Sequence, residues 1–261
     1  MNVDYICCGD SAELMKTLPD ESIDLVVTSP PYDNLRTYNG FCFDFEKIAE
    51  QLFRVIKWGG CIVWVISDGV VNGSETGTSF KQALRFMEIG FNLHDTMIWS
   101  KDACSFPDRT RYCQTFEYMF VFSKGKPKTI NLIADKKNKW GGTNVHGTFR
   151  QPDGSLRERS TTWKEVNIKE YGVRNNVWNV PGEKNNKTGH PAVFPKRLAM
   201  DHIRSWSNEG DVVLEPFLGS GTTAVACIET GRHYIGFDIS EEYVAIAKQR
   251  IEGTTRQLSF I

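Results

Sequence analysis

The sequence predicts an α/β protein built on a doubly wound, mostly parallel sheet. Short apolar runs that suit strands covered on both faces alternate along the chain with segments of helical spacing. A glycine-rich turn at residues 219–224 joins one such run to a helix, which is typical of open α/β sheets. The 261 residues, of which 40% are hydrophobic and 24% charged, suffice for one large core with a small module.

The first half of the chain supplies most of the predicted strands. Residues 3–7 suit a short strand, and the following segment "GDSAELMKTLPDES" suits a turn and a helix. An apolar run at residues 23–28 predicts a buried strand, and helical spacing follows over residues 44–57 up to a glycine pair. Further elements are expected in the order strand, helix, strand, strand, at residues 61–66, 79–88, 94–99 and 115–123.

The strand and helix pattern resumes near the C-terminus after a polar interruption. A helix is expected at residues 195–207, and "DVVLEPF", "SGTTAVACIETG" and "RHYIGFDIS" predict strand, helix and strand before a closing helix at 241–251. The interruption is rich in Gly, Asn and Lys and too long for a simple loop. Its isolated Trp140, Trp163 and Trp178 are expected to pack in a small core. We therefore predict a division into residues 1–123, 124–189 and 190–261.

A basic segment is hidden within a neutral total, because the whole chain carries a net charge of −1. Residues 123–189 hold 14 Lys and Arg against 6 Asp and Glu, or +8, whereas the remainder holds 17 against 26, or −9. Such asymmetry indicates a polyanionic partner, with a solvated lysine-rich loop as the alternative.

The seven cysteines are scattered, with no CxxC pair and no His/Cys spacing that suits a metal. We expect reduced thiols, no metal, and a cytoplasmic protein. No run of the sequence reaches transmembrane length, and the N-terminus has no secretory pattern, so no membrane association is expected.

The glycine-rich turn suits a nucleotide-like ligand. Residues 219–224 match the pattern G-x-G-x-x-A, and Asp238 ends the next predicted strand, 17 residues after Gly221. Glycines let a ligand approach the backbone, and a carboxylate at that strand end accepts from ribose hydroxyls. An adenosine-containing cofactor is therefore predicted, and a tight strand-to-helix connection is the alternative. No Lys and Ser/Thr follow the glycines as a Walker loop requires.

A second turn follows the strand at residues 23–28, where the sequence continues Ser29-Pro30-Pro31-Tyr32. Proline has no backbone N–H and fixes its backbone angle, so the two prolines stiffen the loop and leave its carbonyls as acceptors. A serine hydroxyl and an aromatic ring stand at its two ends. Taken alone, the loop is equally typical of a rigid turn.

The two turns together resemble the β-group DNA amino-methyltransferases. "TSPPY" near the N-terminus and "EPFLGSGTT" near the C-terminus carry the resemblance, which extends to "NVWNVP" at 176–181 and "GHPAVFPKRL" at 189–198. It implies a seven-stranded, Rossmann-like methyltransferase sheet with permuted motif order and an inserted target-recognition region. Two residues depart from the family pattern: Glu215 stands where Asp is common, and Ser29 stands where many adenine enzymes carry Asp or Asn.

The resemblance implies methyl transfer from S-adenosylmethionine to the exocyclic amine of a base flipped out of double-stranded DNA. Ser29, Pro30, Pro31 and Tyr32 are then the catalytic residues: the Ser29 hydroxyl and Pro30 carbonyl accept from the amine, and the ring of Tyr32 stacks on the base. Ser29 favours N4 of cytosine over N6 of adenine. RNA or protein-glutamine methylation, and a catalytically silent nucleic-acid-binding protein, are the alternatives.

The resemblance also implies a set of cofactor-binding residues: Asp10, Phe194, Lys196, Glu215, Phe217, Gly219, Ser220, Gly221, Thr222 and Asp238. Several of these have simpler explanations. Asp10 suits a helix N-cap, Lys196 suits an ordinary helix start, and Phe217 suits packing in a turn.

The basic segment is then assigned to DNA, together with one arginine of the loop after Tyr32. The predicted DNA-binding residues are Arg36, Lys136, Lys137, Lys139, Arg150, Arg157, Arg159 and Arg174. Two copies of the chain are expected to pair, as members of the family often do.

Overall fold

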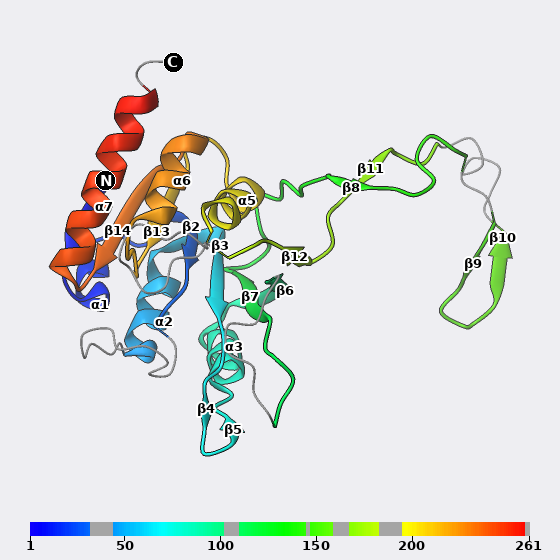
Figure 1. Ribbon diagram of the computed structural model, residues 1–261, viewed down its shortest axis with the longest axis horizontal. Helices are drawn as coiled ribbons and strands as arrows, with labels where there is room; N and C mark the ends of the chain where they lie inside the picture. Colours follow the sequence, from blue (N-terminus) through cyan, green and yellow to red (C-terminus); the bar gives the residue numbers. More distant parts are fainter. Residues whose placement is uncertain (32–43, 102–109, 145–146, 159–166, 183–194, 259–261) are drawn as a thin grey trace. The chain divides into compact units, whose positions relative to one another are not determined.

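The computed structural model describes residues 1–31, 44–101, 110–144, 147–158, 167–182 and 195–258 (Figure 1). The chain forms two compact units. One comprises Met1–Asn131 with Asn176–Ile261, and the other comprises Leu132–Asn175. The boundaries predicted at residues 124 and 189 stay a prediction.

The larger unit contains the central sheet and its helices. In chain order its elements are β1 (Tyr5–Cys8), α1 (Ser11–Met15), β2 (Ile23–Thr28), α2 (Phe45–Val55), β3 (Ile56–Ile66), β4 (Val70–Val71), β5 (Ser74–Glu75), α3 (Thr78–Ile89), β6 (Asn92–Ser100), β7 (Phe116–Ser123), β12 (Val177–Asn179), α5 (Lys196–Trp206), β13 (Val212–Glu215), α6 (Thr222–Thr230), β14 (His233–Asp238) and α7 (Glu241–Leu258).

The central sheet confirms the predicted α/β class. Its strand order is β1-β14-β13-β2-β3-β7-β6-β12, and every neighbouring pair in this part of the described chain is parallel except the two that involve β7 (Figure 1). It has eight strands where the sequence predicted seven, because β12 pairs with β6 at the edge. Part of the "NVWNVP" motif therefore forms an additional strand at the edge of the sheet.

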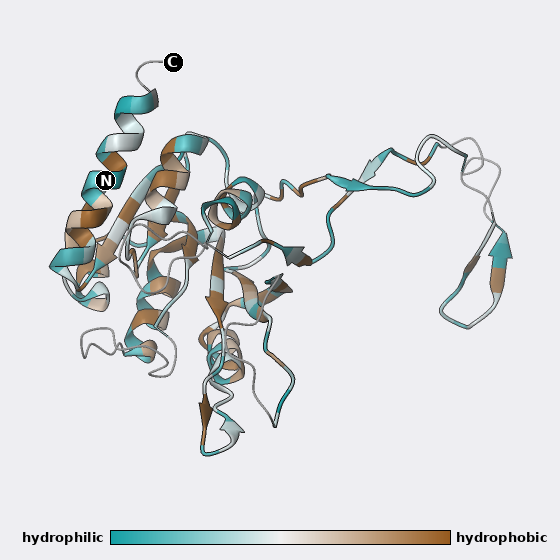
Figure 2. Ribbon diagram, in the orientation of Figure 1, coloured by the Kyte–Doolittle hydropathy of each residue, from teal (hydrophilic) through white to brown (hydrophobic). Residues whose placement is uncertain are grey.

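Helices lie in two layers beside this sheet. α1, α2 and α3 contact one another in sequence, and so do α5, α6 and α7. The strands between them are apolar, as Figure 2 shows, and all six residues of β2 are buried. Burial on both faces explains why the apolar residues Leu25, Val26 and Val27 follow one another directly rather than alternating with polar residues.

α2 illustrates how the local sequence determines where a helix begins and which of its residues are buried. The Asp44 carboxylate caps it by accepting from the backbone N–H of Lys47 at 3.3 Å. Its buried positions Ile48, Leu52 and Val55 recur at helical spacing and join the core. The helix ends at Val55 and β3 begins at once, several residues before the strand that the sequence predicted.

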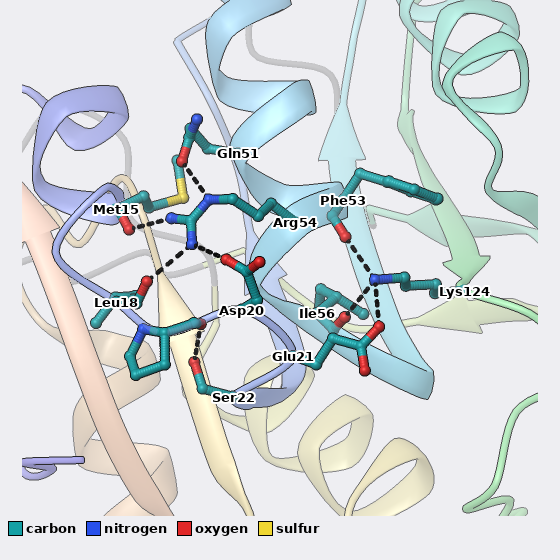
Figure 3. Close-up of polar contacts among 11 residues, drawn as sticks. Met15, Leu18, Asp20, Glu21, Ser22, Gln51, Phe53, Arg54, Ile56 and Lys124 are labelled. Atoms are coloured by element: carbon teal, nitrogen blue, oxygen red, sulfur yellow. Dashed lines mark hydrogen bonds and ion pairs between the residues drawn. The ribbon is translucent and has the colours of Figure 1, made fainter.

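A group of polar contacts fixes the sheet at the edge where β2 and β3 begin. The Arg54 guanidinium donates to the Met15 carbonyl at 2.7 Å, the Leu18 carbonyl at 2.9 Å, the Asp20 carboxylate at 2.6 Å and the Gln51 side chain at 2.9 Å (Figure 3). These bonds satisfy the carbonyls at the end of α1.

Lys124 makes a similar set of contacts from the end of β7. Its buried ammonium donates to the carbonyls of Phe53 and Ile56 at 3.0 and 3.2 Å and to the Glu21 carboxylate at 3.1 Å (Figure 3). The chain after β7 is thereby attached to the α2–β3 junction.

Asp24 completes this edge and joins β2 to two neighbouring strands. Its buried carboxylate accepts from Lys57 and Lys128, both at 2.7 Å, and from the Val212 N–H at 3.1 Å. Burial alone would raise the pKa of Asp24, but these hydrogen bonds outweigh it and hold the pKa below its usual value.

The smaller unit, Leu132–Asn175, consists of short antiparallel pairs. β8 (Lys136–Lys137) pairs with β11 (Tyr171–Gly172), and β9 (Thr148–Arg150) pairs with β10 (Leu156–Glu158). The three tryptophans predicted to pack in a core differ in their surroundings: Trp178 is buried in β12 of the central sheet, and Trp140 is 63% exposed. Trp163 lies outside the described residues.

No helix of the described residues is long and apolar enough to cross a membrane.

Candidate active site

The Ser-Pro-Pro loop and the glycine turn begin on neighbouring strands. β2 and β13 are parallel, with Val26 opposite Leu214, so their carboxyl ends meet at one edge of the sheet. β2 leads into Ser29, Pro30 and Pro31, and β13 leads into the turn that ends at Gly221. The structure thus brings the two predicted motifs together, as open α/β sheets do at their binding edge. Tyr32 lies outside the described residues.

The Glu215 carboxyl group connects these two loops. Glu215 ends β13 and is 2% exposed. The Thr28 hydroxyl, at the end of β2, donates to its Oε1, and the Thr223 hydroxyl, in α6, donates to its Oε2 at 2.8 Å. The backbone N–H of Phe217 also donates to Oε1, at 3.1 Å. The cofactor contact that the sequence predicted for Glu215 stays a prediction.

Burial raises the pKa of Glu215 to about 8, although the hydrogen bonds from Thr28, Thr223 and Phe217 oppose the rise. Two other acidic groups face it: the carboxylate of Asp238, which raises its pKa further, and the thiol of Cys227, whose own pKa is raised by burial.

The glycine turn needs its glycines for two reasons. Gly219 and Gly221 have φ angles of +52° and +83°, which side chains other than glycine adopt at a cost. A Cβ at Gly221 would also lie 2.9 Å from the Cβ of Ala247 in α7. The turn is closed by the Leu218 N–H, which donates to the Phe237 carbonyl of β14 at 2.8 Å.

Asp238 lies at the end of β14, beside the glycine turn. Its Oδ2 accepts from the Gly219 N–H at 2.7 Å, and its Oδ1 accepts from the Ser240 N–H at 2.9 Å. Burial raises the pKa of Asp238, and these two hydrogen bonds oppose the rise. Because each carboxylate oxygen accepts more than one hydrogen bond, Asp238 retains lone pairs for a ligand.

The turn after β1 approaches the same edge. Asp10 caps α1 by accepting from the Glu13 N–H at 3.1 Å, as its simpler explanation predicted. The adjacent Ser11 hydroxyl donates to the carbonyl of Pro216, next to Glu215. Asp10 thus lies one residue from a direct link to the glycine turn, and its cofactor contact stays a prediction.

Arg250 stabilises the glycine turn, and it was not among the site residues predicted from the sequence. Its Nη1 donates to the Ser220 carbonyl at 2.6 Å, the Ser220 hydroxyl at 2.7 Å and the Thr222 hydroxyl at 3.2 Å. Ser220 and Thr222, both predicted to bind cofactor, are buried and direct their hydroxyls to this guanidinium. No motif marks an arginine within the closing helix, so no sequence signal identifies it.

Two further predicted cofactor residues have protein partners. The half-buried ring of Phe217 packs edge-to-face on Trp64 of β3, with 6.3 Å between ring centroids. The Lys196 ammonium, at the start of α5, pairs with Glu229 of α6 at 2.6 Å. Phe194 lies outside the described residues.

The predicted DNA-binding side chains of the smaller unit differ in their partners. Arg174 forms a two-point ion pair with Asp135, in which Nη2 to Oδ2 is 2.5 Å and Nε to Oδ1 is 3.0 Å. Lys136 donates to the side chain of Asn175 at 3.0 Å, and Arg150 donates to the Gly154 carbonyl at 3.1 Å. Arg174 therefore joins the beginning and the end of the chain segment that forms this unit.

The other predicted DNA-binding residues of that unit that the structure describes are exposed, as Lys136 and Arg150 also are. Lys137 and Arg157 are exposed, and Arg157 lies opposite Phe149 in the β9–β10 pair. The Lys139 ammonium lies 5.3 Å from the centre of the Trp140 ring. Arg36 and Arg159 lie outside the described residues.

Residues 23–249 match a protein-family model described as DNA methylase, the N6_N4_Mtase model. The orphan methyltransferase M.BamHII of Bacillus amyloliquefaciens is 55% identical over 247 residues, which cover 92% of each chain. Among solved structures, the cytosine-N4-specific PvuII DNA methyltransferase covers 98% of this chain and 91% of its own, with a TM-score of 0.71 and 21% identity. The DNA modification methylase TTHA0409 of Thermus thermophilus, in complex with S-adenosyl-L-methionine, covers 97% and 94%, with a TM-score of 0.66 and 25% identity.

Ionisation of Glu215 should make the stability of the protein fall as the pH rises. Its pKa is raised in the folded state from an ordinary value of 4.5 to about 8, so the stabilisation is complete below pH 4.5 and is lost as the pH rises to about 8. The free energy of unfolding of the wild type, relative to Glu215→Gln, should fall by about 1.4 kcal/mol per pH unit in this window.

Urea unfolding of both proteins at a series of pH values measures this difference, and the amide variant serves as the control that does not ionise. A difference that stays constant or grows with pH would show that the carboxyl group is already ionised in the folded protein.

Proposed function

Because this chain belongs to the DNA methylase family, and is thus an S-adenosylmethionine-dependent DNA amino-methyltransferase, we propose that its target is N4 of cytosine within a specific site. The observation that carries this proposal is Ser29 at the end of β2, beside the strand that leads into the glycine turn. Ser29 stands where many adenine enzymes carry Asp or Asn. Adenine N6 is the other amine that the same chemistry serves.

The proposed chemistry explains the composition of the Ser-Pro-Pro loop. An exocyclic amine is a weak nucleophile because its lone pair is delocalised into the ring. Hydrogen bonds from the amine to the Ser29 hydroxyl and the Pro30 carbonyl would favour a pyramidal nitrogen with a directed lone pair. Tyr32 would hold the flipped base by stacking, and the two prolines keep the acceptors in place.

Bound S-adenosylmethionine supplies the methyl group on a sulfonium centre. The residues around the glycine turn would hold this cofactor, and its methyl carbon would be taken up by the amine nitrogen, with the electron pair of the carbon–sulfur bond left on sulfur and one amine proton lost to solvent. The chain has to align the two reactants, and neither a covalent enzyme intermediate nor a metal takes part in this step.

The residues around the glycine turn fit this cofactor. Asp238 presents a carboxylate with remaining lone pairs at the end of β14, and it is the proposed ribose ligand. The positive φ angles of Gly219 and Gly221 hold the backbone in a tight turn beside it. The hydroxyls of Ser220 and Thr222 are bonded to Arg250, and the carboxyl group of Glu215 is bonded to Thr28 and Thr223. These three side chains would therefore hold the turn in shape.

The smaller unit, Leu132–Asn175, is the proposed DNA-recognition module. Lys136, Lys137 and Lys139 would contact phosphates, and exposed Arg157 would reach base edges. Pairing of two copies of the chain, and a cytoplasmic location, stay predictions.

The identity of the methylated base is tested by its product. DNA of mixed sequence is incubated with the protein and S-adenosylmethionine carrying a labelled methyl group, digested to nucleosides, and measured by mass spectrometry. The label should appear in N4-methylcytosine. Label in N6-methyladenine alone would refute the choice of base, and the Tyr32→Ala variant shows whether the signal depends on the proposed loop.

Loss of the Asp238 carboxylate should weaken cofactor binding. Asp238→Ala should raise the dissociation constant for S-adenosylmethionine about 10- to 100-fold, which corresponds to the ~1.5–3 kcal/mol of a charged hydrogen bond. Asp4→Ala is a matched control, because Asp4 accepts from the Tyr234 N–H near the opposite end of β14. Calorimetric titration measures both variants, and an unchanged affinity in Asp238→Ala would refute the ribose assignment.

The lysines of the smaller unit should give DNA affinity its salt dependence. Replacing Lys136, Lys137 and Lys139 together with Ala should weaken binding and lower the slope of log K against log salt by up to about 3. The control replaces the exposed Lys16, Lys47 and Lys81 of the larger unit, which changes the net charge equally. Equal losses in the two triple variants would mean that only overall charge matters.

A further inference from the structure

The network around Glu215 connects the two loops that the proposed function requires. Thr28 is fully buried and immediately precedes Ser29, and Thr223 lies in the first turn of α6, just after the glycine turn. Both hydroxyls donate to one carboxyl group, each to a different oxygen. We call this arrangement the Thr28–Glu215–Thr223 bridge.

We propose that Glu215 is a positioning residue that couples the glycine turn to the Ser-Pro-Pro loop through this bridge. This inference rests on the proposed function. The bridge would hold the amine acceptors of Ser29 and Pro30 at a fixed distance and angle from the bound methyl donor. Changes at Thr28, on the target-base side, would then reach the cofactor side through Glu215.

Thr223 lies in the first turn of α6, where no carbonyl of its own helix stands four residues before it. Thr230, at the other end of α6, donates its hydroxyl to the Ala226 carbonyl at 2.7 Å. Thr223 instead donates to Glu215, on another element. The hydroxyl of Thr223 is thus used to connect elements.

The cost of burying Glu215 supports the same conclusion. A carboxyl group in an apolar interior is stabilising only if it is fully hydrogen-bonded, and apolar residues of similar size usually pack as well. Glu215 meets that condition with three donors: two hydroxyls and the Phe217 N–H. The three donors lie at the end of β2, in the turn after β13 and in the first turn of α6, so the bonds fix these segments relative to one another.

Direct cofactor binding by Glu215 is the competing explanation, and Thr28 separates the two. If Glu215 acted only by touching the cofactor, removal of the Thr28 hydroxyl could weaken cofactor affinity but would leave the rate of methyl transfer at saturating cofactor unchanged. If the bridge transmits position, Thr28→Val should also slow methyl transfer at saturating cofactor, and should do so only when Glu215 is present.

The test is a double-mutant cycle with two readouts: cofactor affinity by calorimetry, and the single-turnover rate of methyl transfer to DNA. Thr28→Val should weaken cofactor affinity about 5- to 10-fold and slow transfer at saturating cofactor, as expected for loss of one buried hydrogen bond. In the Glu215→Leu background the same substitution should change either quantity less than about twofold. Glu215→Gln, which keeps one carbonyl oxygen as an acceptor for the Thr28 hydroxyl, should lose less than Glu215→Leu.

Thr230→Val is the matched control, since it removes a buried hydroxyl from α6 without touching Glu215, and it should leave both readouts unchanged.

If Glu215→Leu does not fold, the Thr28→Val and Thr223→Val pair forms the cycle, and their effects should be less than additive. Additive effects, or Thr28→Val variants that lose stability with unchanged affinity and rate, would overturn the proposal. The calorimetric cycle needs no turnover, so its outcome is independent of which base is methylated.

Discussion

The parallel pairing of β2 with β13 is the constraint on which the whole site depends. It brings the end of an N-terminal strand beside the end of a C-terminal strand, and so places Ser29 and the glycine turn at the same edge of the sheet. Because the edge carries two loops from opposite ends of the sequence, their relative position has to be fixed by side chains. The buried carboxyl group of Glu215 does this, because Thr28 donates to it from one side and Thr223 and the Phe217 N–H donate to it from the other.

The sheet is held by different kinds of contact at the two ends of its strands, that is, at the edge where β2 begins and at the edge where β2 ends. At the edge where β2 begins, Asp24, Arg54 and Lys124 tie strands and helix ends together with charged hydrogen bonds. At the opposite edge, Arg250 supports the glycine turn, and backbone N–H groups bind Asp238 in a way that leaves carboxylate lone pairs available. This division suits an enzyme whose stability is secured away from the residues that bind its reactants.

The sequence predicted those features that depend on local pattern, and it missed those that depend on contacts between distant elements. Apolar runs located the strands, and the proline and glycine turns marked both loops of the site. The protein partners of Glu215, the support of the turn by Arg250 and the pairing of Arg174 with Asp135 were not foreseen, because side-chain contacts depend on packing that no spacing encodes. The eighth strand was missed because β12 has only three residues.

A crystal structure of the protein with bound S-adenosylmethionine tests the central claim most directly, since the claim is one of geometry at a single edge of the sheet. The account predicts that the ribose hydroxyls contact Asp238 and that the methyl group points toward Ser29 and the Pro30 carbonyl. A cofactor bound elsewhere, or with its methyl group directed away from the Ser-Pro-Pro loop, would contradict it.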